Sequence, residues 1–410
     1  MIKKIIAIIN IIFILSSFQC ATYADDLLEE LLPEDVESII ETAVNSEDEL
    51  NINSRIAVAY DRCTGEVIWG KDENKRTAMA STTKIMTVTI AVENGNLDDV
   101  VTISAKAAGT GGSRLGLKKD DKISLQDLLY GLMLRSGNDA AIAIAEHIGG
   151  SVEEFSNMMN EKAEELNLKD THFVTPHGLD DPDHYTTAYE LAKLTDYALN
   201  NETVRSIVAT KYYTININGY PKSLVNTNEL LNEIEGIYGV KTGFTNNAGR
   251  CLVTAVKRND MDIITVVLQA DTKKDRGRDS SKIIKYIYDN YKRIDVKEIV
   301  DNEFENWCLA NKNRINVKKA KSSTLNVRRE ALKNDTIVIK KCEEYNIKVE
   351  IKAIFEFEAP IKKNTVIGKI KVTIGDKIVD ITDIYIENKI EKKDTIDYFL
   401  ECIKTFKKIW

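Results

Sequence analysis

The sequence predicts an α+β fold for the larger part of this 410-residue chain, with an antiparallel sheet beside a helical subdomain. Two strand patterns come first, helical patterns follow, and three further strand patterns and a last helix close this part. Late strands that pair beside early ones around a helical layer give this arrangement. Beyond it, alternating apolar and charged residues predict a small all-β domain, and helical spacing predicts a C-terminal amphipathic helix.

Composition limits the class of protein. The length suggests two or three domains, and a hydrophobic content of 43% is enough for a sizeable core. The formal net charge of -8, with no basic cluster that contains aromatic residues, argues against a nucleic-acid partner. The four histidines form no His-x3-His pair, so we expect no metal site and no cofactor.

Residues 1–24 have the pattern of a secretion signal peptide. Lys3 and Lys4 precede an apolar core at residues 5–15, and residues 22–24 form a small-residue cleavage site. The apolar core is short for a membrane span, which favours cleavage over a retained anchor. We therefore expect an exported protein, at the outer face of the cytoplasmic membrane or in the cell-wall space.

The cysteines do not suggest a disulfide framework. Cleavage would remove Cys20, and the bulky Phe18 and Gln19 before it argue against lipid modification. The five others are not clustered, and we expect small, buried, reduced side chains, although an exported protein meets an oxidising space. They are Cys63, Cys251, Cys308, Cys342 and Cys402.

The larger domain is expected over residues 51–295, after an acidic leader at residues 25–50. Residues 55–60 and 66–70 are strand patterns around a Thr-Gly turn, so they predict a hairpin. A helix is expected to follow at residues 81–93, beginning at a serine.

A polar break between two helices comes next. After a short strand at residues 100–104, residues 109–116 form a glycine-rich loop without a phosphate-binding pattern. Apolar spacing predicts helices at residues 125–135 and 140–148, and the second is apolar enough to require burial. The break at residues 136–138 is well placed to present side chains into a cleft.

The rest of the larger domain returns to strands. Residues 155–166 and 188–200 predict helices, and residues 175–182 between them predict a long irregular loop. Three strands and a closing helix are then expected at residues 237–245, 249–257, 261–270 and 276–291.

The composition changes after about residue 295. Apolar and charged residues alternate over residues 347–353, and residues 370–374 and 378–386 form a hairpin pattern. We expect a β-rich domain over residues 296–388 that carries no catalytic constellation.

Residues 389–410 predict an amphipathic helix. One face is apolar and the other is charged, which is typical of a helix that lies in a membrane interface. Packing on the β-rich domain is the alternative, and we favour the membrane surface as the partner. The apolar positions are Ile396, Phe399, Leu400, Ile403, Phe406 and Trp410.

The predicted chemistry centres on Ser81 and Lys84, which lie three residues apart and share one helix face. A serine hydroxyl becomes a strong nucleophile when a base takes its proton, and a buried lysine near a second cation can be that base. This spacing alone is common by chance. Two further signals follow in order: Ser136-Gly137-Asn138 at the helix break and Lys241-Thr242-Gly243 on a strand. Together the three form the signature of serine β-lactamases and penicillin-binding proteins.

With these motifs, the sequence resembles the D-alanyl-D-alanine carboxypeptidases, the low-molecular-mass penicillin-binding proteins. Residues 79–87, 133–141 and 176–181 are similar to stretches of that family, and the resemblance runs over nearly the whole chain. It implies a β-lactamase-like serine-peptidase domain, a β-rich second domain and an amphipathic membrane anchor. It also implies removal of the terminal D-alanine from peptidoglycan stem peptides through an acyl-enzyme, and covalent binding of β-lactam antibiotics.

Chemistry and the resemblance together assign roles to the site residues. Ser81 is the expected nucleophile and Lys84 its base, while Ser136 passes a proton to the leaving amine. His177 is expected to be structural, because Lys84 already serves as the base. The substrate-binding residues are Asn138 for the peptide amide, Lys241 as a second cation, Thr242 and Gly243 as a strand edge, and Phe244, whose N–H joins that of Ser81 in an oxyanion hole.

Arg278 is predicted to bind the terminal carboxylate of the substrate, because a guanidinium can bind a carboxylate through two hydrogen bonds. It lies near the start of the closing helix, in a stretch that resembles the arginine-bearing stretch of the family. Arg276 is the alternative residue, and a solvated charge is the alternative role.

Three rival functions share parts of this pattern. A β-lactamase needs a carboxylate that activates water, and residues 175–189 contain no Glu-x-x-x-Asn arrangement. A transpeptidase of this class would need large extra domains. A catalytically weak penicillin-binding sensor or a wall-associated scaffold is the alternative that we retain.

Overall fold

The structure is a computed structural model that describes residues 35, 38, 50–312, 314–322 and 325–409. The chain divides into two compact units, Met1–Asp289 and Asn290–Trp410, whereas the sequence analysis placed this boundary after residue 295. The expected signal peptide and nearly all of the acidic leader lie outside the described residues.

A five-stranded antiparallel sheet forms the centre of the first unit. Its order is β2 (Glu66–Lys71), β1 (Ile56–Asp61), β9 (Met261–Ala270), β8 (Gly249–Arg258) and β7 (Ile237–Thr245). The two ends of the unit meet here, because β1 pairs with β9 and places Ile56 opposite Leu268. The predicted hairpin and the three predicted late strands are confirmed, and β7, with its Lys-Thr-Gly sequence, is an edge strand.

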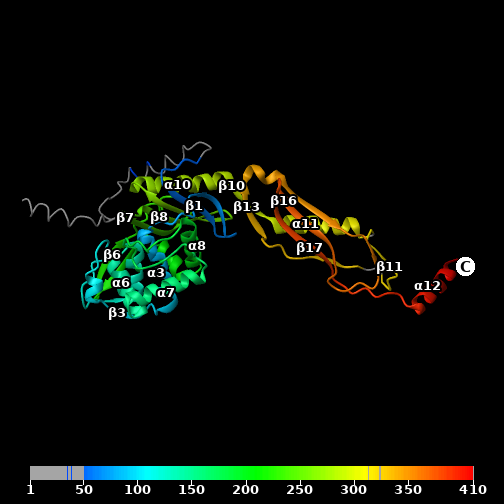
Figure 1. Ribbon diagram of the computed structural model, residues 1–410, viewed down its shortest axis with the longest axis horizontal. Helices are drawn as coiled ribbons and strands as arrows, with labels where there is room; N and C mark the ends of the chain where they lie inside the picture. The colour runs from blue at the N-terminus through cyan, green and yellow to red at the C-terminus, as the bar shows by residue number, and fades with distance from the viewer. Residues whose placement is uncertain (1–34, 36–37, 39–49, 313, 323–324, 410) are drawn as a thin grey trace, which may run out of the picture. The chain divides into compact units, whose positions relative to one another are not determined.

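Helices cover both faces of this sheet (Figure 1). Ser280 of α10 (Lys273–Asn290) contacts Thr254 and Thr265 on one face, while α8 (Ala188–Leu199) packs against β1 and β9 on the other. Other helices surround α3 (Lys84–Asn94), whose first residues from Lys84 to Ala91 are all buried. They are α5 (Leu125–Leu134), α6 (Asn138–Gly149), α7 (Val152–Glu165) and α9 (Glu202–Ala209), with the short α4 (Ala105–Ala108) against α6.

The turn that carries Ser81 differs from the prediction. The sequence predicts an α-helix from Ser81, but Ala80–Thr83 form a 3-10 turn, η2, and α3 begins at Lys84. Ala80 has a φ of 48°, in the left-handed region that alanine rarely adopts. The chain therefore turns sharply just before Ser81.

Two small hairpins complete the first unit. β3 (Val100–Thr102) pairs with β4 (Lys122–Ser124), and β5 (Tyr212–Ile217) pairs with β6 (Tyr220–Val225). The sequence analysis missed β5 and β6, although an Asn-Gly turn between alternating residues is a strong hairpin signal.

The second unit is β-rich, as predicted. Its main sheet has the order β12 (Val327–Arg329), β17 (Lys377–Ile386), β16 (Val366–Ile374) and β14 (Ile347–Ala353), so the predicted strand and hairpin are confirmed. The smaller elements are the pairs β10 (Tyr291–Asp295) with β13 (Thr336–Lys340) and β11 (Asn316–Lys318) with β15 (Glu356–Glu358), and a 3-10 turn, η3 (Lys341–Asn346).

One helix of the second unit was not predicted. α11 (Val296–Asn311) buries Val296 and Val300 in the same apolar cluster as the strands. Asp295 caps it by accepting a hydrogen bond from the N–H of Glu298. This Asp-x-x-Glu sequence is a helix-start signal that the sequence analysis overlooked.

The predicted C-terminal helix is present as α12 (Thr395–Ile409). Ile396, Phe399 and Leu400 are exposed on it, while the side chains of Phe406 and Trp410 lie outside the described part. Within the described ranges, no helix is both long and apolar enough to cross a bilayer.

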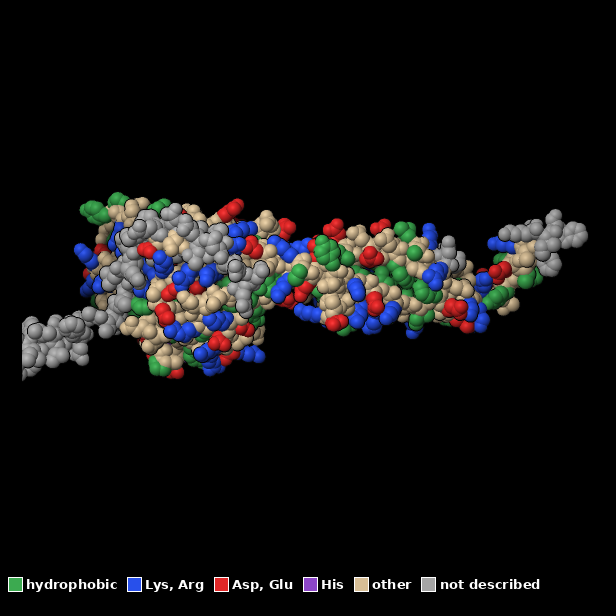
Figure 2. Space-filling view, turned by 90° about the horizontal axis from the view of Figure 1, so that it is seen from above, with side chains coloured by type: hydrophobic (Ala, Val, Ile, Leu, Met, Phe, Trp, Pro, Cys, Tyr) green, Lys and Arg blue, Asp and Glu red, His purple; other side chains and the backbone are tan. Residues whose placement is uncertain are grey.

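Surface charges and cysteines add two observations. Positive and negative side chains are interspersed over the face of each unit that Figure 2 shows. Among the described cysteines, Cys251 is buried as expected and Cys308 is half-buried. The expectation of burial is wrong for Cys63, Cys342 and Cys402, which are exposed because they lie in a turn, in η3 and on α12.

Candidate active site

Ser81 and Lys84 meet at the junction of η2 and α3. The distance from Lys84 Nζ to Ser81 Oγ is 2.8 Å, and Lys84 is fully buried. An amine at this distance can take the proton of the hydroxyl, provided that the amine is neutral.

Two carbonyl oxygens fix the Lys84 amine. Asn138 Oδ1 lies 2.7 Å from Nζ, and the backbone oxygen of His177 lies 2.9 Å from it. Both carbonyls accept hydrogen bonds from this amine and hold it beside the hydroxyl of Ser81. The contacts of Lys84 therefore fit a general base.

The start of α6 holds Asn138 in place. Its backbone N–H donates to the oxygen of Ser113, and its Nδ2 donates to the oxygen of Gly111, each at 2.8 Å. Gly112 between them has a φ of 79°, and a Cβ there would lie 2.6 Å from Asn138 Nδ2. The carboxylate of Asp139 accepts three further backbone N–H groups of this loop, at residues 115–117. The glycine-rich loop is therefore a wall of the site, built around Asn138.

A second loop supports the serine turn from behind. Gly178 has a φ of 85°, and a Cβ there would lie 1.9 Å from the oxygen of Ala80. Thr87 of α3 donates to the oxygen of Pro176 at 2.6 Å. Burial, with the charge of Lys84 as a lesser cause, lowers the pKa of His177 to about 3, so its ring is neutral near pH 7. The contacts of His177 with Lys84 run through its backbone, which agrees with the expected structural role.

Strand β7 forms the opposite wall. A Cβ on Gly243 would lie 3.0 Å from the backbone nitrogen of Ser81, so a side chain there would push the strand and the turn apart by a few tenths of an ångström. Thr242 is hydrogen-bonded to Thr227 at 2.8 Å between the hydroxyl oxygens. The ring of Phe244 stacks under the guanidinium of Arg250, 3.8 Å from ring centroid to Cζ.

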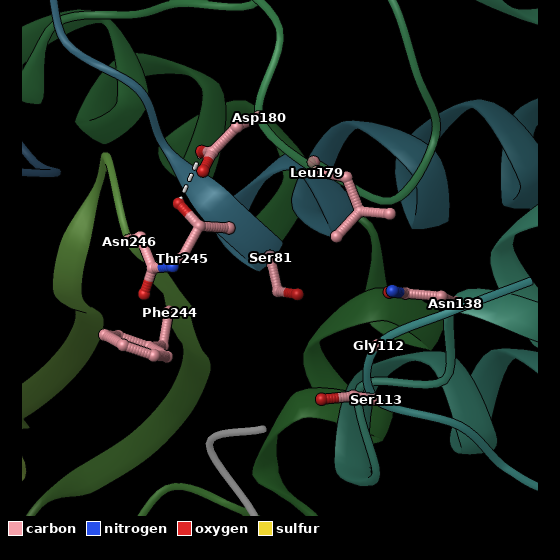
Figure 3. Close-up of a pocket in the computed structure, with 10 residues that line it drawn as sticks. Ser81, Gly112, Ser113, Asn138, Leu179, Asp180, Phe244, Thr245 and Asn246 are labelled. Carbon is pink, nitrogen blue, oxygen red and sulfur yellow. Dashed lines mark hydrogen bonds between the residues drawn. The ribbon is translucent and has the colours of Figure 1, made fainter. Parts of the chain in front are cut away.

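These elements enclose a cavity of about 190 Å³ (Figure 3). Ser81 lies between Asn138 and Ser113 on one side and Phe244, Thr245 and Asn246 on the other. Of the predicted site residues, Ser81, Asn138 and Phe244 line it. The sequence analysis missed seven lining residues, although it noted the glycine-rich loop and the family-like stretch that supply five of them. The seven are Gly112, Ser113, Gly178, Leu179, Asp180, Thr245 and Asn246.

Ser136 and Lys241 lie on the elements that flank the pocket. Ser136 has a φ of 61° and is buried in the turn before Asn138. Lys241 is buried on β7 and donates to the oxygen of Thr242 at 3.0 Å. Ser136 thus lies two residues before Asn138, which contacts Lys84, and Lys241 lies two residues before Gly243, which faces the turn of Ser81; the roles assigned to both remain predictions.

The structure does not bring Arg278 to the pocket. Arg278 forms an ion pair with Asp275, one turn earlier on α10, and it is absent from the described residues that line the cavity. Arg276, the alternative, is fully buried and pairs with Glu229 at 2.9 Å. Both guanidiniums thus already hold a carboxylate of the protein, which the sequence alone could not indicate.

A serine paired with a buried lysine, beside a glycine-bearing strand edge, defines a serine hydrolase that works through an acyl-enzyme. Comparison with known families agrees. The family model for D-alanyl-D-alanine carboxypeptidase matches residues 42–272, and the model for the penicillin-binding protein 5 C-terminal domain matches residues 308–392. The chain therefore belongs to the D-alanyl-D-alanine carboxypeptidase family, and it is a serine-type peptidase of the penicillin-binding protein class.

Individual relatives cover from about half to most of the chain. The chain is 33% identical to D-alanyl-D-alanine carboxypeptidase DacF of Bacillus subtilis (strain 168), over 85% of this chain and 89% of the relative. It is 37% identical to a D-alanyl-D-alanine carboxypeptidase of Streptomyces sp. (strain K15), over 56% of this chain and 84% of the relative. Penicillin binding protein 5 from Haemophilus influenzae has a similar solved structure, with a TM-score of 0.66 and 27% identity, over 85% of this chain and 100% of that one.

Proposed function

We propose that this protein removes the terminal D-alanine from peptidoglycan pentapeptide stems by acylation and deacylation of Ser81. The observation that carries the proposal is the contact set of Lys84, with its amine 2.8 Å from Ser81 Oγ and two carbonyls on its other sides.

The reaction proceeds in two halves. Ser81 Oγ attacks the carbonyl carbon between the two D-alanines while Lys84 takes the hydroxyl proton. The N–H groups of Ser81 and Phe244 stabilise the resulting oxyanion. The C–N bond then breaks, Ser136 passes its proton to the departing amine and receives the proton held by Lys84, and D-alanine leaves. Water next attacks the ester carbon, which frees the shortened stem and returns a proton to Ser81.

Strand β7 and α6 bind the substrate in this proposal. An extended peptide adds to the β7 edge beside Gly243, where the absence of a side chain permits close approach. Asn138 binds a peptide amide of the substrate, and Lys241 contributes positive charge on the same strand. β-Lactam antibiotics react with Ser81 in the same way, and covalent penicillin binding is typical of this class.

The first test is D-alanine release from a muramyl-pentapeptide mimic that ends in D-Ala-D-Ala, with protein that lacks residues 1–24. We expect the Ser81→Ala variant to lose both release and labelling by a fluorescent penicillin, with the thermal unfolding temperature unchanged. Ser113→Ala is the matched control, because it removes a hydroxyl from the same cavity and leaves the assigned nucleophile in place. Labelling that persists in Ser81→Ala would show that the nucleophile is another residue.

The alternative function is a catalytically weak penicillin-binding sensor or wall scaffold. It predicts penicillin labelling at Ser81 without release of D-alanine from the mimic. A β-lactamase would instead turn penicillin over many times per second. The pocket carboxylate of Asp180 accepts a hydrogen bond from Thr245 Oγ1 at 2.5 Å, which supports slow release of penicillin because this carboxylate is engaged by the protein.

We also propose that the protein works outside the cytoplasm and attached to the membrane surface. The signal-like residues 1–24 support export, and the exposed apolar side chains of α12 support contact with a membrane interface. Its partners would then be the stem peptides of the wall and the lipid surface below them.

A further inference from the structure

A buried chain of hydrogen bonds leads from His184 to the turn before the nucleophile. His184 Nε2 lies 2.7 Å from Thr83 Oγ1, and Thr83 Oγ1 donates to the backbone oxygen of Ala80 at 2.8 Å. Both side chains are almost completely shielded from solvent. This chain is separate from the contacts of Lys84, and the mechanism above does not use it.

The contact of His184 Nδ1 determines which group donates in each of these hydrogen bonds. His184 Nδ1 accepts the backbone N–H of Val174 at 2.9 Å, so Nδ1 carries no proton. The proton of the neutral ring is therefore on Nε2, which donates to Thr83 Oγ1. The Thr83 hydroxyl oxygen thus accepts a hydrogen bond from His184, and the same hydroxyl donates its own proton to the oxygen of Ala80. Burial lowers the pKa of His184 to about 4, so this tautomer holds at neutral pH.

The end of the chain lies on the peptide group that joins Ala80 to Ser81. A peptide unit is planar, so fixing its oxygen also fixes the direction of its N–H. That N–H belongs to Ser81 and is one of the two oxyanion donors in the proposed function. Ala80 is held at a φ of 48°, a conformation that an alanine keeps only where surrounding contacts determine it.

We propose that His184 is a positioning residue that acts through the Thr83 hydroxyl to orient the Ala80–Ser81 peptide, and hence the oxyanion-stabilising N–H of Ser81. The proposal rests on acylation of Ser81. Hydrogen-bond donors that are aimed before the reaction stabilise the oxyanion without reorganisation, so a loss of aim slows acylation and leaves substrate binding nearly unchanged.

Thr83 gives the sharpest test, because valine has nearly the same shape but lacks the hydroxyl. We expect Thr83→Val to lower the acylation rate with fluorescent penicillin and the kcat of D-alanine release by roughly tenfold to a hundredfold, with KM within about twofold of the wild type. Thr83→Ser keeps the hydroxyl and should acylate at nearly the wild-type rate. A Thr83→Val variant that acylates at the wild-type rate would overturn the proposal.

His184 variants separate positioning from folding. His184→Gln can keep a donor near Nε2, whereas His184→Asn can keep an acceptor for the Val174 N–H but places no donor near Thr83. We expect His184→Asn to lose acylation as Thr83→Val does and His184→Gln to regain part of it, with unfolding temperatures that do not follow this order. The double variant Thr83→Val/His184→Asn should be no slower than either single one. The proposal would be overturned if the double variant lost the product of the two single-variant losses in acylation rate. It would also be overturned if His184→Gln acylated more slowly than His184→Asn.

Penicillin labelling and D-alanine release test this inference and the proposed function separately. If wild-type protein is labelled at Ser81 but releases no D-alanine, the carboxypeptidase proposal fails, and the acylation rates still decide the role of His184.

Discussion

At the scale of single residues, the first unit places cationic side chains where they are costly to bury. Lys84, Lys241 and Arg276 are among its largest fully buried side chains. Burial of a charge is tolerated only when the charge is paired or the group is neutral. Arg276 is paired with Glu229, and Lys84 donates hydrogen bonds to the oxygens of Asn138 and His177 beside the nucleophile. Arg276 is thus buried in a contact that stabilises the fold, and Lys84 in one that serves catalysis.

The two arginines of α10 give the first prediction at this scale. Arg278 and Asp275 are a partly exposed pair one turn apart, so Arg278→Ala should change the free energy of unfolding by about 0.5 kcal/mol or less and leave KM unchanged. Arg276→Ala should cost about 3 kcal/mol or more, because it leaves the Glu229 carboxylate buried without its partner. Urea unfolding and D-alanine release measure both effects. A tenfold rise of KM in Arg278→Ala, with stability intact, would restore the assignment made from the sequence.

The sequence could indicate part of the site because some of its geometry is local. Ser81 and Lys84 meet through their spacing, and Asn138 follows from a motif at a helix break. Arg278 could not be placed in this way, because its position near a helix start does not reveal the carboxylate of Asp275 one turn before it. Asp180 reaches the cavity only through the tertiary packing of its loop, which no local pattern encodes.

At the scale of elements, the loop over residues 175–184 acts as a support for the serine turn. Gly178→Ala should lower the free energy of unfolding by about 3 kcal/mol or more and slow acylation, because a Cβ 1.9 Å from the Ala80 oxygen forces that peptide to move. Gly219→Ala is the matched control, since Gly219 has a φ of 84° and open space around it. The control should cost only about 1 kcal/mol from backbone strain and leave acylation unchanged. Equal losses in the two variants would mean that strain, not contact with Ala80, makes the glycine necessary.

The same loop carries two buried histidines that predict a dependence of stability on pH. Burial lowers the folded-state pKa of His177 to about 3 and of His184 to about 4, below the value of about 6.5 for an unfolded histidine. Below pH 6.5 the unfolded chain therefore binds more protons, and stability falls by about 1.4 kcal/mol per pH unit for each ring until its folded pKa is reached.

Urea unfolding between pH 6.5 and 4.5 measures this loss, in a window above most carboxylate titrations. We expect His184→Gln to show a shallower loss than the wild type, because it has one buried titrating ring fewer. A wild-type stability that is constant over this window would contradict the neutral state of both rings.

Helices and strands could be predicted where burial produces a clear pattern of apolar residues along the sequence, as in β8, β9 and α6. The 3-10 turn at Ser81 could not, because alanine does not itself prefer the left-handed conformation of Ala80, which is packed against the distant Gly178 and hydrogen-bonded by Thr83 of the same turn. The β5–β6 hairpin and α11 do carry local signals, an Asn-Gly turn and an Asp-x-x-Glu cap.

At the scale of the whole molecule, the chemistry lies in one unit and the proposed attachment in the other. The described site residues all belong to Met1–Asp289, while α12 belongs to Asn290–Trp410. Asp397 on this helix pairs with Lys321, and Glu401 pairs with Lys393. The charged side of α12 is thus joined to its own unit, while Ile396, Phe399 and Leu400 stay exposed.

This arrangement predicts that α12 mediates membrane attachment and is not required for acylation. Deletion of residues 395–410 should abolish co-sedimentation with phosphatidylglycerol-containing vesicles, while the rate of penicillin labelling at Ser81 stays within about twofold of the wild type. Phe399→Asp should weaken vesicle binding strongly, because it places a charge on the apolar face, whereas Glu401→Gln on the charged face should not. If α12 instead packs on the β-rich unit, the deletion would lower the unfolding temperature of that unit and leave vesicle binding unchanged. The two explanations for the exposed apolar residues therefore give opposite results in the same pair of measurements.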